Sequence, residues 1–362
     1  MSSWTPSSEQ PQTNAVLNSI LIGVLALFFV IPCHLKANSI GFVYSDGVRT
    51  LFPDVSTLDH INDSGDFVGS SYSHGAFVYQ AGSFTYFGPG EAYGISNTGK
   101  VVGVLANGFS YQNGVLTDLG IPFGNYDSIA RAVNDSGAIA GHSESNVNTP
   151  AVMQTSWLID GPTTTNLGTL TAGFYLTNVF AMNNLDQIVG DVQVSPGVNH
   201  MYIWSPSNGM VDLGLGSGNA LGINNQGDVV GSFETTHGFL YHNGATVDLQ
   251  QSVLGPAGWL DSDATAINDR GQIVGSGNYP DGQGGYIGAG YLLTPDGLSS
   301  SGYDVTLLGQ GLHPTSVNNF GVVAGMMQVV VTPELSTLLY VTSALLLGGI
   351  FLQSKRRRPH TP

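Results

Sequence analysis

The sequence contains a single cysteine, Cys33, among 362 residues. An intrachain disulfide is therefore impossible, and packing alone must stabilise the fold. Charged residues are also scarce, at 9% of the chain, and between residues 40 and 332 there are 23 Asp and Glu against four Lys and Arg, a net charge of −19. So acidic a surface repels phosphate backbones, and nucleic acid is not expected as a partner. An acidic, solvated surface is also the ordinary condition of a secreted protein.

Signatures of nucleotide, metal and hydrolase chemistry are likewise missing. The chain has no Gly-x-x-x-x-Gly-Lys phosphate loop, no Cys/His set with metal-ligand spacing and no Gly-x-Ser-x-Gly nucleophile elbow. No catalytic residue, metal ligand or cofactor is predicted. Ca²⁺ is the one ion that the acidic surface could attract, but the Asn-Asp-Ser-Gly-Asp stretch at 62–66 has too few carboxylates at alternate positions for a calcium loop.

Glycine, by contrast, is abundant, with 50 residues, and much of it belongs to a repeated phrase first seen as Ile61-Asn-Asp-Ser-Gly-Asp-Phe-Val-Gly-Ser70. An apolar residue and Asn end one β-run, a tight Asn/Asp/Ser/Gly turn follows, and a β-branched or aromatic run leads to a second glycine. Six further copies begin at Ile95, Val133, Met182, Ile223, Ile267 and Val317. The second glycine should mark a close backbone approach or a strand bend. These glycines are Gly69, Gly103, Gly141, Gly190, Gly231, Gly275 and Gly325.

Between the copies lie an aromatic phrase, such as Phe77-Val-Tyr-Gln-Ala-Gly82, and a short run ending in Asp-Leu-Gly, as at 118–120. One unit therefore contains four strands. The second glycines recur about every 43 residues, a period typical of four-stranded propeller blades. The sequence thus predicts an all-β, seven-bladed β-propeller of four-stranded antiparallel blades over residues 40–331. A β-solenoid is the alternative, but the spacing is too uneven for stacked coils.

These phrases resemble the HAF family of extracellular repeats, named for a His-Ala-Phe that occurs here as His74-Gly-Ala-Phe77 and His237-Gly-Phe239. The match spans about residues 40–327. The resemblance implies an exported, propeller-like protein and implies no reaction.

The two ends of the repeat region are complementary. The region begins with an aromatic strand pair at 42–52 that has no Asn-turn pair before it, and it finishes with an Asn-turn pair at 317–327 that has no aromatic pair after it. A two-stranded half is marginal alone and exposes an edge that the other half can pair. We expect the two halves to form one composite blade that closes a ring.

Length variation is confined to the connections between strands two and three and between successive units, which lie on one face of such a scaffold. Long loops on a rigid scaffold are where recognition usually occurs. Aromatic and polar residues assigned to these loops suit a carbohydrate ligand. The candidate ligand-binding residues are Tyr126, His142, Glu144, Trp259, Asp261, Asp263 and Tyr286.

Three histidines, His74, His200 and His237, precede aromatic strands at equivalent places. On one rim they could bind a metal, yet they belong to different units. Strand-end packing or hydrogen bonding is the expected role.

The N-terminal segment 1–39 carries an apolar run at 20–33, too short to span a bilayer comfortably and typical of the core of an export signal. Cleavage is expected near Ala37. Pro32 stands where a lipoprotein signal has a small residue, which argues against lipidation of Cys33.

The C-terminal segment 332–362 has three parts in order: Pro333-Glu334, an apolar stretch at 335–352, and the cations Lys355, Arg356, Arg357 and Arg358. The apolar stretch is long enough for a transmembrane helix, and the cations place its end in the cytoplasm. This order resembles the PEP-CTERM sorting tail of Gram-negative bacteria, with Leu335 in place of the second motif proline. The resemblance implies recognition by an exosortase-type membrane enzyme. The alternative is a plain single-pass anchor.

Together these features predict an exported protein, anchored in the inner membrane before processing and then at the cell surface or outside the cell. It would act as a binding or structural module of the envelope or of an extracellular polysaccharide matrix. The competing expectation is a secreted polysaccharide lyase or hydrolase, whose acid and base would come from His142, Glu144, Asp261 and Asp263.

Overall fold

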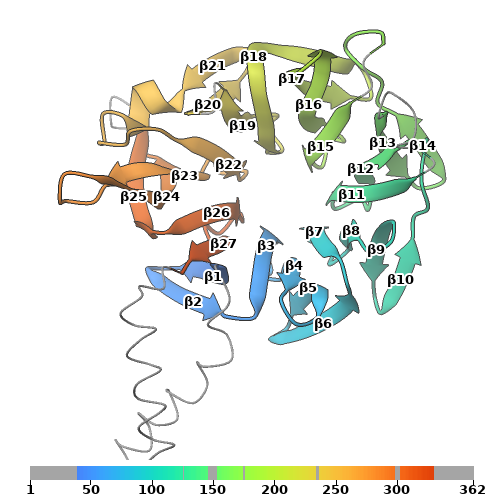
Figure 1. Ribbon diagram of the computed structural model, residues 1–362, viewed down its shortest axis with the longest axis horizontal. Helices are drawn as coiled ribbons and strands as arrows, with labels where there is room; N and C mark the ends of the chain where they lie inside the picture. Colours follow the sequence, from blue (N-terminus) through green and yellow to red (C-terminus); the bar gives the residue numbers. More distant parts are fainter. Residues whose placement is uncertain are drawn as a thin grey trace, which may run out of the picture.

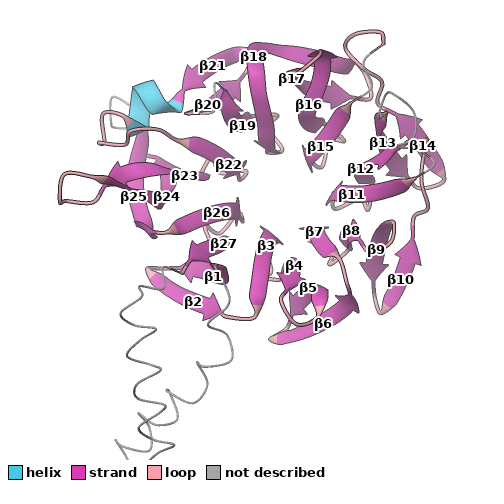
Figure 2. Ribbon diagram, in the orientation of Figure 1, coloured by secondary structure: helices cyan, strands magenta, loops and turns pink. Residues whose placement is uncertain are grey.

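The computed structural model describes residues 39–124, 126–145, 153–173, 176–233, 236–297 and 302–329 (Figure 1). Within them the chain forms strands β1 to β27 and one helical element, the five-residue π-helix η1 (Gln250–Leu254) (Figure 2). The predicted all-β architecture is therefore confirmed. No helix in the described part of the chain is long and apolar enough to cross a membrane. The predicted export segment before Ser39, the motif Pro333-Glu334, the apolar stretch 335–352 and the cations at 355–358 lie outside the described residues.

The strands form four-stranded antiparallel units in chain order. Unit 1 contains β3 (Val55–Ile61), β4 (Phe67–Ser71), β5 (Gly75–Gln80) and β6 (Ser83–Gly88); unit 2 contains β7 (Glu91–Ile95), β8 (Val101–Val104), β9 (Gly108–Gln112) and β10 (Val115–Asp118). Unit 3 contains β11 (Asp127–Val133), β12 (Ile139–Glu144), β13 (Gln154–Asp160) and β14 (Thr163–Asn166). Unit 4 contains β15 (Thr177–Met182), β16 (Ile188–Ser195), β17 (Val198–Ser205) and the first part of β18 (Gly209–Ile223).

Unit 5 shares β18 with unit 4, so that the two units form one seven-stranded sheet. Its remaining strands are β19 (Val229–Phe233), β20 (His237–His242) and β21 (Ala245–Asp248). Unit 6 contains β22 (Asp263–Ile267), β23 (Ile273–Pro280), β24 (Tyr286–Pro295) and β25 (Tyr303–Gln310).

The last sheet, called here the end sheet, joins the two ends of the described chain. Its strand order is β2 (Val48–Phe52), β1 (Ser39–Ser45), β27 (Val323–Gln328) and β26 (Leu312–Val317). Strands β1 and β27 pair antiparallel from Ser39 opposite Gln328 to Tyr44 opposite Val323. The predicted composite sheet is confirmed.

Figure 1 shows the sheets arranged around a common centre, with the first strand of each unit on the inside. Buried side chains of the described residues form seven clusters, and each cluster lies between two successive units, with the end sheet counted as one unit. Ala324 of the end sheet, for example, packs with Leu58 of unit 1, whereas Phe42 on the other face packs with Val274 of unit 6. Each fully buried side chain of this size contributes about 1.5–3 kcal/mol of transfer free energy. Apolar packing therefore contributes strongly to holding neighbouring units together.

The second glycine of each repeat lies where the first two strands of a unit approach most closely. In every unit the pairing of these strands shifts by one residue, a β-bulge, beside that glycine. A Cβ added at Gly190, Gly231 or Gly275 would lie 1.9 Å from a backbone carbonyl oxygen of the first strand. The predicted close approach and bend are both confirmed.

Candidate functional site

The Asn that recurs in the tight turns, replaced by Ser96 in one copy, first stabilises its own hairpin. Asn62 Oδ1 accepts hydrogen bonds from the backbone N–H groups of Ser64 and Asp66, each at 3.0 Å. Gly65 completes the turn in the left-handed region, with φ of 80°. Asn183, Asn224, Asn268 and Asn318 repeat both bonds. The predicted turn chemistry of the phrase at 62–66 is therefore confirmed.

The same side chains also join neighbouring units. In five copies the Asn Nδ2 donates to the backbone carbonyl of the equivalent turn residue in the next unit. These bonds run from Asn62 to Ser96, Asn183 to Asn224, Asn224 to Asn268, Asn268 to Asn318 and Asn318 to Asn62, at 2.7–3.2 Å. One amide therefore satisfies its own turn and the adjacent one.

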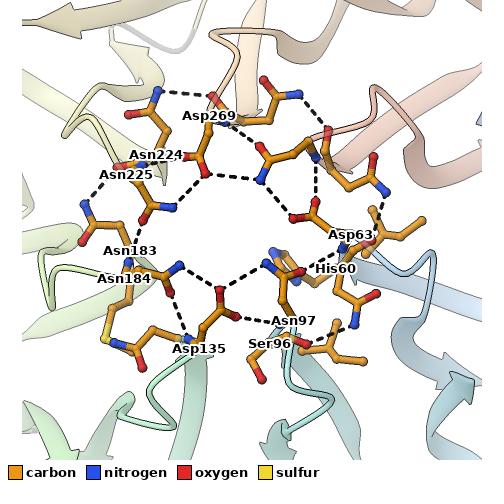
Figure 3. Close-up of a pocket in the computed structure, with 18 of the residues that line it drawn as sticks. His60, Asp63, Ser96, Asn97, Asp135, Asn183, Asn184, Asn224, Asn225 and Asp269 are labelled. Carbon is orange, nitrogen blue, oxygen red and sulfur yellow. Dashed lines mark hydrogen bonds between the residues drawn. The ribbon is translucent and has the colours of Figure 1, made fainter.

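The residue after each turn Asn or Ser forms a second circuit, called here the turn ring (Figure 3). Its members are Asp63, Asn97, Asp135, Asn184, Asn225, Asp269 and Asn319. Each backbone N–H donates to the side-chain oxygen of the next member. The bonds run from Asp63 to Asn97, Asn97 to Asp135, Asp135 to Asn184, Asn184 to Asn225, Asn225 to Asp269, Asp269 to Asn319 and Asn319 to Asp63, at 2.7–2.9 Å. The circuit is closed.

Charge is distributed evenly around the turn ring. No two of its three aspartates are neighbours, so like charges are kept apart. Each carboxylate also accepts from a side-chain amide: Asn319 Nδ2 donates to Asp63 Oδ2 at 3.1 Å, and Asn184 Nδ2 donates to Asp135 Oδ2 at 2.8 Å. The carboxylates are thereby held in fixed orientations.

The turns enclose a cavity of about 130 Å³ at the centre of the molecule, called here the axial cavity. It is lined by the last apolar residue of the first strand, the turn residue and the turn-ring residue from all seven copies, and by His60. A buried cavity of about 150 Å³ holds one benzene molecule. The axial cavity therefore has room for one six-membered ring or a few water molecules.

His60 breaks the symmetry of the axial cavity. It occupies the position after the bulge of the first strand, where the other copies have Gly94, Ala132, Ala181, Gly222, Ala266 and Ser316. The imidazole keeps an exposed edge, yet desolvation by the surrounding chain lowers its pKa, against the opposing effects of a hydrogen bond to the Ile95 backbone and of Asp63 and Asp135. His60 is therefore neutral at pH 7.

Above the turn ring, the third residue of each turn forms a rim that is partly apolar. Two of these positions carry large exposed side chains, Leu185 at 63% and Phe320 at 67% exposure. Arg270, at the neighbouring position, lies with its Cζ 5.7 Å from the centre of the Phe320 ring. Phe320 directly follows the cavity-lining residue Asn319, and an exposed aromatic side chain next to a polar cavity suits a ligand with one polar and one apolar face.

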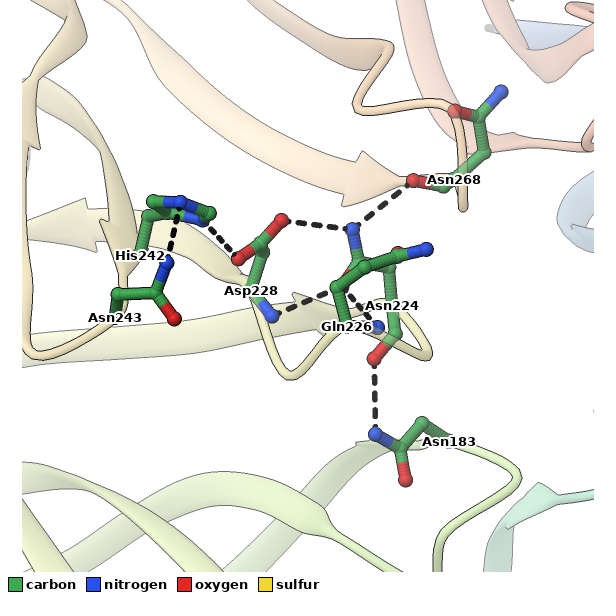
Figure 4. Close-up of polar contacts among 7 residues, drawn as sticks. All are labelled: Asn183, Asn224, Gln226, Asp228, His242, Asn243 and Asn268. Carbon is green, nitrogen blue, oxygen red and sulfur yellow. Dashed lines mark hydrogen bonds and ion pairs between the residues drawn. The ribbon is translucent and has the colours of Figure 1, made fainter.

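A hydrogen-bonded relay leads outward from the cavity wall (Figure 4). Asn224 Nδ2 donates to Asp228 Oδ2 at 3.1 Å, and Asp228 Oδ1 is bonded to His242 Nδ1. The second imidazole nitrogen of His242 is 2.7 Å from Nδ2 of Asn243. The relay ties the turn between the first two strands to the turn between the last two, which places both kinds of tight turn on the same face.

A second polar cluster lies on the inner strands of units 1 to 3. Arg131 places its Cζ 4.1 Å from the centre of the Tyr93 ring, and one carboxylate oxygen of Asp59, Oδ2, is buried without a hydrogen-bond partner among the described residues. Burial, with a contribution from Glu91, raises the pKa of Asp59 to about 8. Asp59 is therefore largely protonated at neutral pH.

The structure corrects the assignment of Trp259 to an exposed loop. Its side chain is only 4% exposed and packs against Tyr279 and Tyr291, with ring centres 5.0 and 5.3 Å away. The long connection between units 5 and 6 folds back through η1, and Gln250 Nε2 donates to the Trp259 carbonyl at 2.9 Å. Trp259 is a core residue.

Asp261 and Asp263 also have structural roles. Asp261 accepts from the backbone N–H and from Nδ2 of Asn278, at 2.7 and 2.8 Å, and Asp263 Oδ1 accepts from the backbone N–H and hydroxyl of Ser276. Both carboxylates bind the adjacent strand β23. Asp261 lies in the connection before β22, as expected, whereas Asp263 begins that strand, and a ligand-binding role for either stays a prediction.

His142 was expected in a loop but lies within β12, only 3% exposed, because that strand continues past Gly141 to Glu144. Burial lowers the pKa of His142 to about 4, with Arg131 adding to the effect, and Nδ1 has no hydrogen-bond partner in the described chain. Glu144 ends the same strand opposite Asp127, and its pKa is raised by burial and by that carboxylate. Neither residue lies on a free loop.

Tyr126 and Tyr286 are exposed, at 56% and 54%. Tyr126 adjoins unit 3 and Tyr286 begins β24 of unit 6, on opposite sides of the molecule in Figure 1. The structure therefore does not bring the predicted ligand-binding residues together. A role for these two tyrosines stays a prediction.

The three histidines before aromatic strands have the hydrogen-bonding role that was expected. His200 Nδ1 is 2.7 Å from Asp212 Oδ2, and His237 Nδ1 is 2.8 Å from Asp248 Oδ2. His74 stacks on Tyr86 at 4.4 Å between ring centres. Among the described residues no group of three or more His, Cys, Asp or Glu could hold a metal ion.

Sequence reasoning missed the turn ring and the axial cavity. The signal was present, because Asn or Asp follows the turn Asn or Ser in all seven copies. A tight turn alone does not require a second such residue at that place. Asn or Asp recurs at this position because its side-chain oxygen accepts a hydrogen bond from the backbone N–H of the turn-ring residue in the preceding unit.

No protein-family model and no curated protein sequence matches the chain. Among solved structures, the chain is similar to the crystal structure of a triple arginine-to-alanine mutant of AofleA from Arthrobotrys oligospora. The two are 12% identical, and the match covers 82% of this chain and 94% of that chain with a TM-score of 0.38. A similarity of this size supports no conclusion about function.

Proposed function

We propose that the chain is a seven-bladed β-propeller that acts as an exported binding module of the cell envelope or of an extracellular polysaccharide matrix. Seven core clusters between successive units, the end sheet and the closed turn ring support the seven-bladed form. The export segment, the motif Pro333-Glu334 and the cations Lys355–Arg358 support export and sorting.

The observation that carries the binding role is the axial cavity, to which every repeat contributes the same polar positions. Amides and carboxylates held in fixed orientations suit the hydroxyl groups of a sugar, and Phe320 at the rim offers an aromatic surface to its apolar face. The volume is slightly below that of a cavity that holds benzene, so part of one sugar unit enters the cavity and the rest of the polymer lies outside.

Binding is favoured over the alternative of a polysaccharide lyase or hydrolase. Such an enzyme needs an acid and a base on either side of one bond. Asp261 and Asp263 are instead occupied by Asn278 and Ser276 of their own sheet, and His142 is buried.

The proposal is tested with the full chain, purified in a detergent that has no sugar headgroup and screened on a glycan array. Saccharide binding by the wild type that is lost in Asn225→Ala, with Tyr286→Ala unaffected, is the expected result. Loss in Tyr286→Ala alone would move the site to the long-loop face, and no binding to any glycan would contradict the proposal. For sorting, a reporter fused after Arg358 should be active in the cytoplasm, and periplasmic activity would contradict the orientation.

A further inference from the structure

The axial cavity carries an unbalanced negative charge. Three aspartates of the turn ring line it, and none of its described lining residues is Lys or Arg. His60 is neutral at pH 7 and does not offset these charges. Half-enclosed charges are screened less than surface charges, so the cavity repels acidic sugars and attracts a cation.

The free hydrogen-bonding capacity of the cavity consists mainly of acceptors. The backbone N–H groups of the turn ring are all used by the next member, and both bonds from Asn319 Nδ2 go to carboxylates, Asp63 and Asp269. Among the described residues, Asp63 accepts two bonds, both from Asn319, of the roughly four that a carboxylate can accept. A ligand that enters the cavity must therefore bring donors.

His60 adds one more acceptor on the side where charge is greatest. His60 lines the cavity, and the neutral form of an imidazole has one unprotonated ring nitrogen that can accept a hydrogen bond. Asp63 and Asp135 act electrostatically on this imidazole and belong to the units on either side of Asn97. The cavity is thus most acceptor-rich between units 1 and 3.

We infer that the sugar unit bound in the axial cavity is an amino sugar with a free primary amine. The ammonium group would lie near Asp63, Asp135 and His60, the hydroxyl groups would bond to the remaining turn-ring oxygens, and the apolar ring face would contact Phe320. This inference rests on the proposed saccharide binding and names the class of sugar.

Three β-1,4-linked tetrasaccharides that differ only at carbon 2 provide the test. The glucosamine tetramer carries an ammonium group there, the N-acetylglucosamine tetramer an amide and the glucose tetramer a hydroxyl. Binding is measured by titration calorimetry with the full chain in the same detergent, at about pH 7, where an amine with a pKa of about 7.7–8 is largely protonated. We expect the glucosamine tetramer to bind at least about tenfold more tightly than the other two.

Two variants test the residues. Asp63→Asn keeps a side chain that four turn-ring positions already have, and it should reduce that preference about fivefold or more. Asp46→Asn makes the same charge change on an exposed turn outside the cavity and should have no effect. His60→Ala introduces the residue found in three other copies and should weaken binding of the glucosamine tetramer.

The outcomes separate the inference from the proposed function. Equal affinity for all three tetramers, or tightest binding of an oligouronate, would overturn the amino-sugar inference and leave saccharide binding intact. No binding of any oligosaccharide would overturn both. A preference for the glucosamine tetramer that survives Asp63→Asn and Asp135→Asn, both with unchanged melting temperature, would overturn the assignment to this cavity.

Discussion

Asn319 and Asp63 are 256 residues apart in the chain and are joined by two hydrogen bonds, from the backbone N–H to Oδ1 at 2.8 Å and from Nδ2 to Oδ2 at 3.1 Å. Asn319 belongs to the end sheet and Asp63 to unit 1. This contact therefore completes the circuit of the turn ring. It is the polar counterpart of the apolar packing between Ala324 and Leu58.

The Asp63–Asn319 contact should contribute measurable coupling energy. Asp63→Ala and Asn319→Ala should each lower the free energy of unfolding by about 1–3 kcal/mol, because each leaves a polar partner without its hydrogen bonds. The double variant should lose less than the sum, by about 0.5–2 kcal/mol. Denaturant unfolding of the four proteins measures this. As a control, the losses of stability in Asn166→Ala, in unit 3, and Asp63→Ala should add up in the double variant. If the losses in Asn319→Ala and Asp63→Ala also add up, the bond is not formed in solution.

The second glycine should not tolerate even a methyl group. In Gly231→Ala the added Cβ would lie 1.9 Å from the Asn219 carbonyl oxygen, so the bulge must open, at a cost of at least about 3 kcal/mol. Gly288→Ala is the matched control in a strand, because its Cβ would meet only His313 Cε1 at 3.9 Å. Thermal unfolding should show a large decrease for the first and little change for the second. Similar melting temperatures would contradict the observed approach of the strands.

Trp259 and Tyr286, which the sequence placed together on a recognition surface, should behave differently. Trp259→Ala removes a buried ring and should cost about 3–5 kcal/mol. Tyr286→Ala removes a side chain that is 54% exposed and should change stability by less than about 0.5 kcal/mol. Chemical denaturation of both variants decides between core and surface; a small effect of Trp259→Ala would contradict its burial.

Asp59 should make stability fall with rising pH. Its pKa is about 8 in the folded chain, against about 3.9 in an unfolded one, so the folded state holds the proton over the interval between them. The free energy of unfolding therefore declines from about pH 4 to pH 8. Asp59→Asn removes this decline. The stability of the variant relative to the wild type should therefore be greater at pH 8.5 than at pH 5, by about 2 kcal/mol. Each pKa unit corresponds to about 1.4 kcal/mol, and the value is reduced because part of the side chain remains solvated.

Denaturant unfolding at the two pH values gives this difference. Glu91→Gln provides the second variant, because Glu91 raises the pKa of Asp59; the decline should then end at lower pH. An equal effect of Asp59→Asn at both pH values would show that Asp59 is ionised throughout.

Features that depend on local backbone chemistry could be predicted from the sequence. The turns at Asn62 and its equivalents, the close approach at Gly231 and the joining of β1 with β27 all follow from residue types at fixed places in a repeat. Each such residue meets a requirement set within its own unit or by an unpaired strand edge.

Features that depend on contacts between units could not be predicted from the sequence. Asn97 was one more turn residue in the sequence, and its role as the acceptor for Asp63 exists only once two units lie side by side. Likewise, two long connections were taken as exposed loops. The connection before Trp259 folds into the core through η1. The connection after Gly275 is largely an extended hairpin, in which Tyr286 lies opposite Pro280. Loop length alone does not reveal whether the chain folds back on the core.

The pairing of β1 with β27 has a consequence for the order in which the protein is made. The first described strand has its neighbour in the last one, so a chain that emerges N-terminus first keeps one edge of β1 unpaired until nearly the whole repeat region has followed. A chain interrupted before Val323–Gln328 never covers that edge and remains open to proteolysis or to pairing with another chain. The end sheet can therefore form in full only in a molecule whose repeat region is complete.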